Sequence, residues 1–144
     1  MKIGLQFPSA TVGRDVIAMR DFAQAAEALG YSHLIFNEHI VGASRAGAPP
    51  PDTEHHELMV LMSYLAGATS TIGLLTAVMV LPQRQTVVVA RQAAELDLIS
   101  GGRLRLGIAV GGRPEEYVAT GTSYHDRGKR IEEQVRLMRD LWTK

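Results

Sequence analysis

Short apolar runs alternate with longer amphipathic stretches along the whole chain. The apolar runs cover residues 3–7, 32–37, 71–81 and 104–110, and their lengths are typical of β-strands. Apolar positions at spacings of three and four predict helices between the runs and after the last one. Because strand and helix patterns recur about every thirty residues, the sequence predicts a parallel sheet with right-handed crossovers.

The third apolar run changes character in its middle. Large residues open and close it, whereas the small, partly polar pair Thr76-Ala77 interrupts it. Small side chains in the middle of a buried strand often mark a bulge or a ligand that approaches the backbone. The alternative is that a larger neighbouring side chain fills the space.

Candidate chemistry lies where the predicted strands end. In parallel β/α folds the working residues gather at the carboxyl ends of the strands. The pair Glu38-His39 ends the second run, and Gly111-Gly112 follows the fourth. Histidine titrates near neutrality, so His39 is a candidate general base or proton donor. The alternative is a hydrogen-bonded structural histidine.

Composition excludes several classes of function. Fifteen basic residues balance fifteen acidic ones in a chain of 144, and no basic cluster carries interleaved aromatics, so nucleic-acid binding is not expected. The absence of cysteine removes disulfides and thiolate metal sites. The adjacent pair His55-His56 lacks the spacing of a zinc site, so we predict no metal. No apolar run has the length of a membrane span and no signal peptide is expected, which favours the cytoplasm.

Four motifs together resemble a known family. They are IGLQFP, IFNEHI, the block from IGLLTAVMVLP to LRLGIAVGG, and RGKRIEEQVRLMRDLW. In this order they resemble the N-terminal half of the luciferase-like monooxygenases, a family of flavin- or F420-dependent oxidoreductases with a TIM-barrel fold. The resemblance implies an α/β fold of four β-α units of a TIM (β/α)8 barrel, that is, a half-barrel with parallel strands. Residues 1–144 would form a single domain.

The same resemblance implies roles for individual residues. His39 would be the catalytic histidine and Glu38 a polar residue beside the cofactor ring. A bulge behind the ring would fall on Thr76, Ala77 and Val78, with a cis peptide between the last two. The cofactor would also contact Val110 and Gly111, at the end of the fourth strand.

The chain departs from the family pattern at two places. Many members read Gly-Thr-Gly-Val where this chain has residues 75–78, Leu-Thr-Ala-Val. Some F420-dependent dehydrogenases place a catalytic glutamate where this chain has Gly112, with Glu115 and Glu116 slightly later. A two-residue acid-base scheme of that kind is therefore not predicted.

The expected activity is F420-dependent hydride transfer to or from a small organic substrate. The alternatives are an FMN-dependent monooxygenase and, from another class, a non-catalytic half-barrel that serves as an assembly module. A TIM barrel needs eight units, whereas four are present, so we expect a homo-oligomer or a missing C-terminal half-barrel as partner. The Gly- and Pro-rich residues 42–57 would roof the pocket and be poorly ordered.

Overall fold

The four predicted strands form one parallel sheet. A computed structural model describes residues 1–41 and 56–144. In it β1 (Gly4–Gln6), β2 (His33–Phe36), β3 (Gly73–Val80) and β4 (Leu104–Ala109) are paired in the order β1-β2-β3-β4, every pair parallel. The predicted fold class, α/β with four parallel strands as in half of an eight-stranded barrel, is confirmed.

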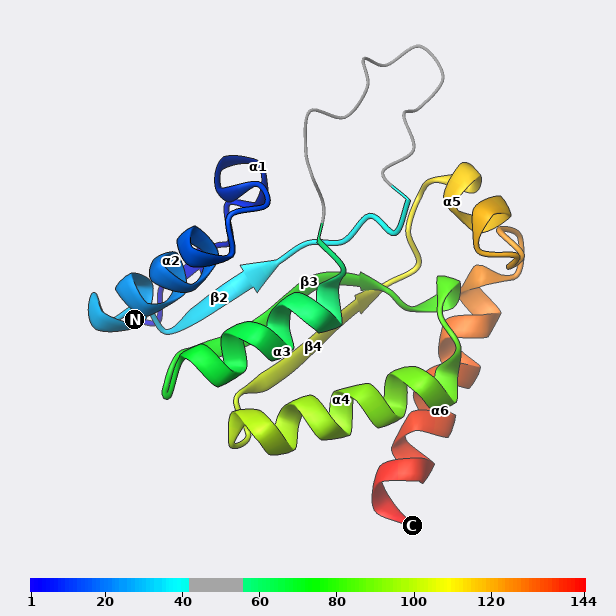
Figure 1. The fold of residues 1–144 in the computed structure, drawn as a ribbon. Helices are drawn as coiled ribbons and strands as arrows, with labels where there is room; N and C mark the ends of the chain where they lie inside the picture. The colour runs from blue at the N-terminus through cyan, green and yellow to red at the C-terminus, as the bar shows by residue number, and fades with distance from the viewer. Residues whose placement is uncertain (42–55) are drawn as a thin grey trace.

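Helices follow the strands and cover one face of the sheet. Figure 1 shows α3 and α4 side by side on that face, with all visible arrowheads directed toward the edge where α5 begins. The helical elements are α1 (Ser9–Val12), α2 (Val16–Ala28), α3 (Leu58–Ala68), the 3-10 turn η1 (Leu81–Gln83), α4 (Thr86–Ser100), α5 (Pro114–Ala119) and α6 (Arg127–Thr143).

Local chemistry sets where the longer helices begin and end. The Asp15 carboxylate accepts hydrogen bonds from two backbone N–H groups of the first turn of α2. Glu57 caps α3 in the same way, accepting from the Val60 N–H. The end of α4 is set by Gly101, whose φ of 70° is the left-handed conformation that glycine adopts at little cost.

The core lies between the sheet and its helices. Leu34 in β2 and Leu74 in β3 are fully buried there, against Leu65 of α3 and Leu96 of α4. The alternate residues of these strands point to the opposite face, and Leu75, one of them, is only half-buried and outside the core cluster. One face of the sheet is therefore covered by helices and the other is left open within the described residues.

Two short helices lie after β1 and after β4. Residues 9–12 form α1, and residues 114–119 form α5. Pro114 occupies the first turn of α5, followed there by Glu115 and Glu116. Proline has a helical φ already and acidic groups favour a helix N-terminus, which explains this helix. Most of the predicted roof, residues 42–55, lies outside the described residues.

The last helix packs as its apolar stripe predicts, with one difference. Met138 is buried, and Ile131 and Val135 pack against the core. Trp142 is half-exposed, and its indole N–H donates to the Ala90 carbonyl at 3.0 Å. Among the helices of residues 1–41 and 56–144, none has the length and apolar character to cross a membrane.

Candidate functional site

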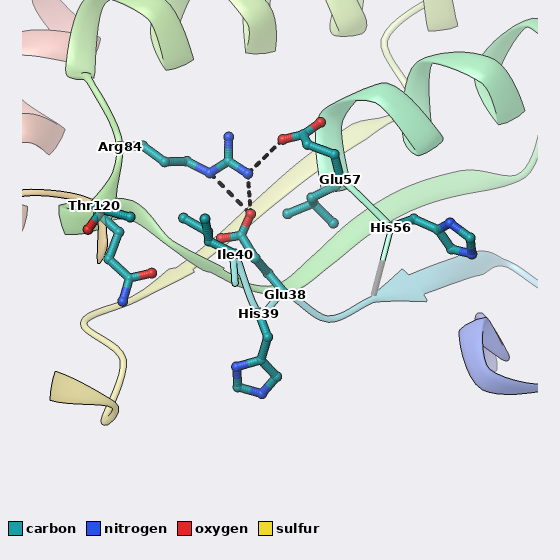
Figure 2. A pocket seen from close by; sticks show the side chains of 9 residues that line it. Glu38, His39, Ile40, His56, Glu57, Arg84 and Thr120 are labelled. Atoms are coloured by element: carbon teal, nitrogen blue, oxygen red, sulfur yellow. Dashed lines mark hydrogen bonds and ion pairs between the residues drawn. The ribbon is translucent and has the colours of Figure 1, made fainter. Parts of the chain in front are cut away.

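Two consecutive residues at the end of β2 point in opposite directions. Figure 2 shows the Glu38 carboxylate turned toward Arg84 and Glu57, whereas the His39 ring points away from all three. The predicted pair is thus split between two environments.

Glu38 is held by the end of the neighbouring strand. It is 6% exposed, one oxygen accepts from the Val80 N–H at 2.8 Å, and the other accepts from the Arg84 guanidinium. Arg84 also donates to Glu57 at 2.7 Å. Burial alone would lower the pKa of Arg84, but its hydrogen bonds and charge interactions with Glu38 and Glu57 raise it above the ordinary value. Contact of Glu38 with a cofactor stays a prediction.

His39 is paired with a buried acid for which the sequence predicted no role. Its Nδ1 lies 3.0 Å from Oε1 of Glu116, a residue of α5 that is 2% exposed. The amide of Gln83 donates to the other Glu116 oxygen at 3.4 Å, and the Arg113 guanidinium lies 3.9 Å from Oε1. The sequence did contain a signal for this residue: Glu116 falls in the first turn of a helix that begins just beyond the fourth strand.

A polar cleft adjoins both environments. It encloses about 510 Å³ and is lined by residues that follow β2, begin α3, follow β3 and end α5, among them His39, Glu57, Gln83, Arg84 and Thr120. The bulge residues and the end of β4 are not part of its lining. The predicted site residues therefore do not all line this cleft.

The predicted bulge in β3 is present. The register between β3 and β4 shifts between Thr76 and Met79, and the Ala77–Val78 peptide is cis, as expected. Regular alternation would bury every second residue, but here Ala77 and Val78 are both exposed and the next two residues are both buried.

Close backbone contacts surround the bulge. Thr76 is fully buried and its hydroxyl donates to the Gly107 carbonyl at 2.7 Å. A Cβ added to Gly107 would lie 2.2 Å from the Thr76 carbonyl oxygen, so only glycine fits there. The bulge of β3 and the backbone of β4 are therefore packed directly together.

Close contacts also hold the backbone just after β4. Gly111 has a φ of 66°, and a Cβ added to it would lie 2.6 Å from Cγ1 of Val80. The Val110 carbonyl accepts a hydrogen bond from the hydroxyl of the fully buried Tyr117, and burial raises the pKa of that hydroxyl. Within the part of the chain that the structure describes, no three acidic or histidine side chains are placed to hold a metal ion.

Comparisons with known proteins point to one family. The family model for luciferase-like monooxygenases matches residues 4–144. An uncharacterised protein of Mycobacterium tuberculosis (strain ATCC 25618 / H37Rv) is 32% identical over 88% of this chain and 50% of its own length. The F420-dependent hydroxymycolic acid dehydrogenase of the same strain is 31% identical over 84% of this chain and 33% of its own.

The fold is also found in solved structures. The oxygenating constituent of 3,6-diketocamphane monooxygenase from Pseudomonas putida, solved in complex with FMN, superposes with a TM-score of 0.76 and 23% identity. The match covers 99% of this chain and 40% of that chain. This likeness shows the fold alone. The chain spans about half the length of the first curated relatives it matches.

Proposed function

Because the chain belongs to the luciferase-like monooxygenase family, we propose that it supplies half of an oxidoreductase site in which His39 exchanges a proton with a small organic substrate. The cofactor would be F420, lying over the bulge at Thr76, Ala77 and Val78. When bound, such a ring supplies the hydride chemistry that no side chain provides. The chain's own residues would position the ring and move the proton.

The observation that carries this proposal is the exposure of the bulge residues. Ala77 is exposed in the bulge, and Val78 is 38% exposed. His39 points away from the helix-side cluster around Glu38 (Figure 2). We infer that the bulge and His39 border the same open side of the sheet.

The residues present fit a flat, largely apolar ring. The bulge offers one small and one apolar side chain, and the neighbouring position in β4 is Gly107, where no side chain rises from the strand. Val110 and Gly111, which we predict to contact the cofactor, lie at the end of the same strand pair. Glu38 would act indirectly, because its carboxylate holds Val80 and Arg84.

The F420 proposal is supported by kinship with the F420-dependent hydroxymycolic acid dehydrogenase, at 31% identity over 84% of this chain. A second candidate is an FMN-dependent monooxygenase, in which the same residues would surround a flavin. It is supported by the description of the family and by the FMN complex with the same fold. The substrate in either case would be a small molecule.

Titration of the chain with F420 and with FMN, followed by absorbance and fluorescence, tests the proposal. We expect saturable binding of F420, weakened by Ala77→Phe, which fills the space over the bulge. Ala25→Phe, at an exposed position of α2, is the matched control and should bind as the wild type does. Binding of FMN alone would favour the second candidate, and binding of neither would contradict both for this chain.

The edges of the sheet support a further part of the proposal. β1 and β4 each have one strand neighbour in the described sheet, so a barrel would need a second half to pair with both. We propose association with another half-barrel, most simply a second copy. Light scattering at micromolar concentration tests this, and a stable monomer would contradict it.

A further inference from the structure

The Glu116 carboxylate is surrounded by hydrogen-bond donors. Gln83 turns its amide nitrogen toward Oε2, because the reversed amide would set two acceptor oxygens against each other. Oε1 of Glu116 lies 3.9 Å from the guanidinium of Arg113 and 3.0 Å from Nδ1 of His39. An ionised carboxylate only accepts hydrogen bonds, so this arrangement fits a charged Glu116.

The state of the histidine follows from that of the acid. A carboxylate cannot donate, so the nitrogen that faces it must carry the hydrogen, and a neutral imidazole has only one N–H. We propose that Glu116 is a positioning residue that holds neutral His39 as the Nδ1–H tautomer. On the proposed function, this makes Nε2 the atom that exchanges a proton with the substrate.

Burial strengthens the interaction between Glu116 and His39. Glu116 is 2% exposed and Gln83 is 5% exposed, so water competes little for the carboxylate oxygens. Gln83 belongs to η1, whose carbonyls are held by α6: Arg130 donates to Pro82 at 2.9 Å and Gln134 donates to Leu81 at 3.2 Å. The helix layer thereby fixes the donor that orients the acid.

This role differs from that of an acid-base glutamate. Both Glu116 oxygens face groups of the protein, and the residue lies on α5 instead of directly after β4. Glu116 therefore acts through His39. Its contribution is to select which ring nitrogen carries the hydrogen, as the buried acid of a serine-protease triad does for its histidine.

Long-range 15N–1H correlation spectra of the chain labelled at histidine test the proposal without any ligand. At about pH 9 an ordinary histidine is neutral, and the two ring nitrogens then report which one is protonated. The chain has five histidines, and the signals of His39 are identified by their loss in His39→Gln. We expect the Nδ1–H tautomer for nearly all of His39 in the wild type.

Two variants of α5 separate positioning from a general effect of charge. In Glu116→Gln the new amide can turn its NH2 toward Nδ1, so the Nδ1–H share should fall to about half or less. Glu115→Gln removes the same charge from the neighbouring, exposed residue and should leave the tautomer unchanged. Equal spectra in the two variants would overturn the proposal.

The wild-type spectrum alone is decisive if Glu116→Gln does not fold, since an Nε2–H tautomer of His39 would overturn the proposal. The result is independent of the proposed function. An Nδ1–H tautomer in a chain that binds neither F420 nor FMN would support the positioning role and reject the cofactor proposal.

Discussion

The two sides of the β2 end differ in how their ionisable groups are satisfied. On the helix side, Glu38 is bound by a backbone N–H and by a guanidinium that is itself shared with Glu57. On the other side, Nδ1 of His39 lies 3.0 Å from one oxygen of Glu116, and the ring remains 28% exposed. Adjacent residues of one strand end thus have a closed and a partly open environment.

We infer from this difference that Glu38 stabilises the fold, whereas His39 has the chemical role. The Glu38 carboxylate links the end of β2 to Val80 of β3 and, through Arg84, to Glu57 at the start of α3. A histidine whose ring is partly exposed can exchange a proton with a ligand. The charge partner of Glu38 is Arg84, which donates to its carboxylate through two guanidinium nitrogens.

Arg84→Met should cause the largest loss of stability. It leaves the buried carboxylate of Glu38 without its charge partner, and breaking such a pair costs about 3 to 5 kcal/mol. Urea unfolding measures the change in free energy. The control is Arg91→Met, because Arg91 is exposed and its ion pair with Glu95, at 3.6 Å, spans one helix turn. Equal effects of the two variants would contradict a structural role for Glu38.

Gly111→Ala should cause the second largest loss of stability, because Gly111 lies against Val80, whose N–H donates to Glu38. The left-handed φ and the contact with Val80 together predict a loss of about 2 to 4 kcal/mol. Gly121→Ala is the matched control: its φ is 65°, but a Cβ there meets no atom within 4 Å. Thermal unfolding should therefore show a clearly smaller loss for Gly121→Ala, and similar losses would exclude the contact as the cause.

Glu27→Gln tests a second carboxylate that accepts several hydrogen bonds. This carboxylate lies just before the start of β3, whereas Glu38 lies at its end. Glu27 accepts hydrogen bonds from the backbone N–H groups of Ser70, Thr71 and Ile72. Because the amide keeps an acceptor and loses the charge, we expect a loss of about 1 to 2 kcal/mol in urea unfolding. Glu132→Gln, which alters an exposed helix ion pair, should change stability by less than about 0.5 kcal/mol.

The pH dependence of stability should carry a contribution from Glu27. Burial opposes its charged form, but the backbone hydrogen bonds outweigh burial and hold the pKa of Glu27 at about 2, below the ordinary 4.5. The unfolded chain therefore binds this proton first as the pH falls. Between these two values the wild type should lose stability more steeply than Glu27→Gln, and identical slopes in acid unfolding curves would refute the assignment.

The strands, the long helices and the bulge could be predicted because each depends on local pattern. The apolar runs and the small pair Thr76-Ala77 carry that information in consecutive residues. The family resemblance added the cis peptide and the roles of Glu38 and His39. These features need no knowledge of distant contacts.

The partners of the site residues could not be predicted, because they depend on tertiary packing. Glu116 reaches His39 across 77 positions of sequence, and Arg84 reaches Glu38 across 46. Glu116 lies on a helix of six residues, too short to show a clear apolar stripe. Only the fold shows that Glu38 is saturated while His39 has an acid behind it.

Urea unfolding of Glu38→Gln and of His39→Gln, measured under the same conditions, tests most directly whether these two neighbours have different roles. Glu38→Gln should lower the free energy of unfolding by at least about 2 kcal/mol, because it disrupts a buried, charge-assisted network. His39→Gln should lower it by less than about 1 kcal/mol, since the ring is partly exposed. Equal losses, or a larger loss for His39→Gln, would contradict the assignment of a structural role to Glu38 and a chemical one to His39.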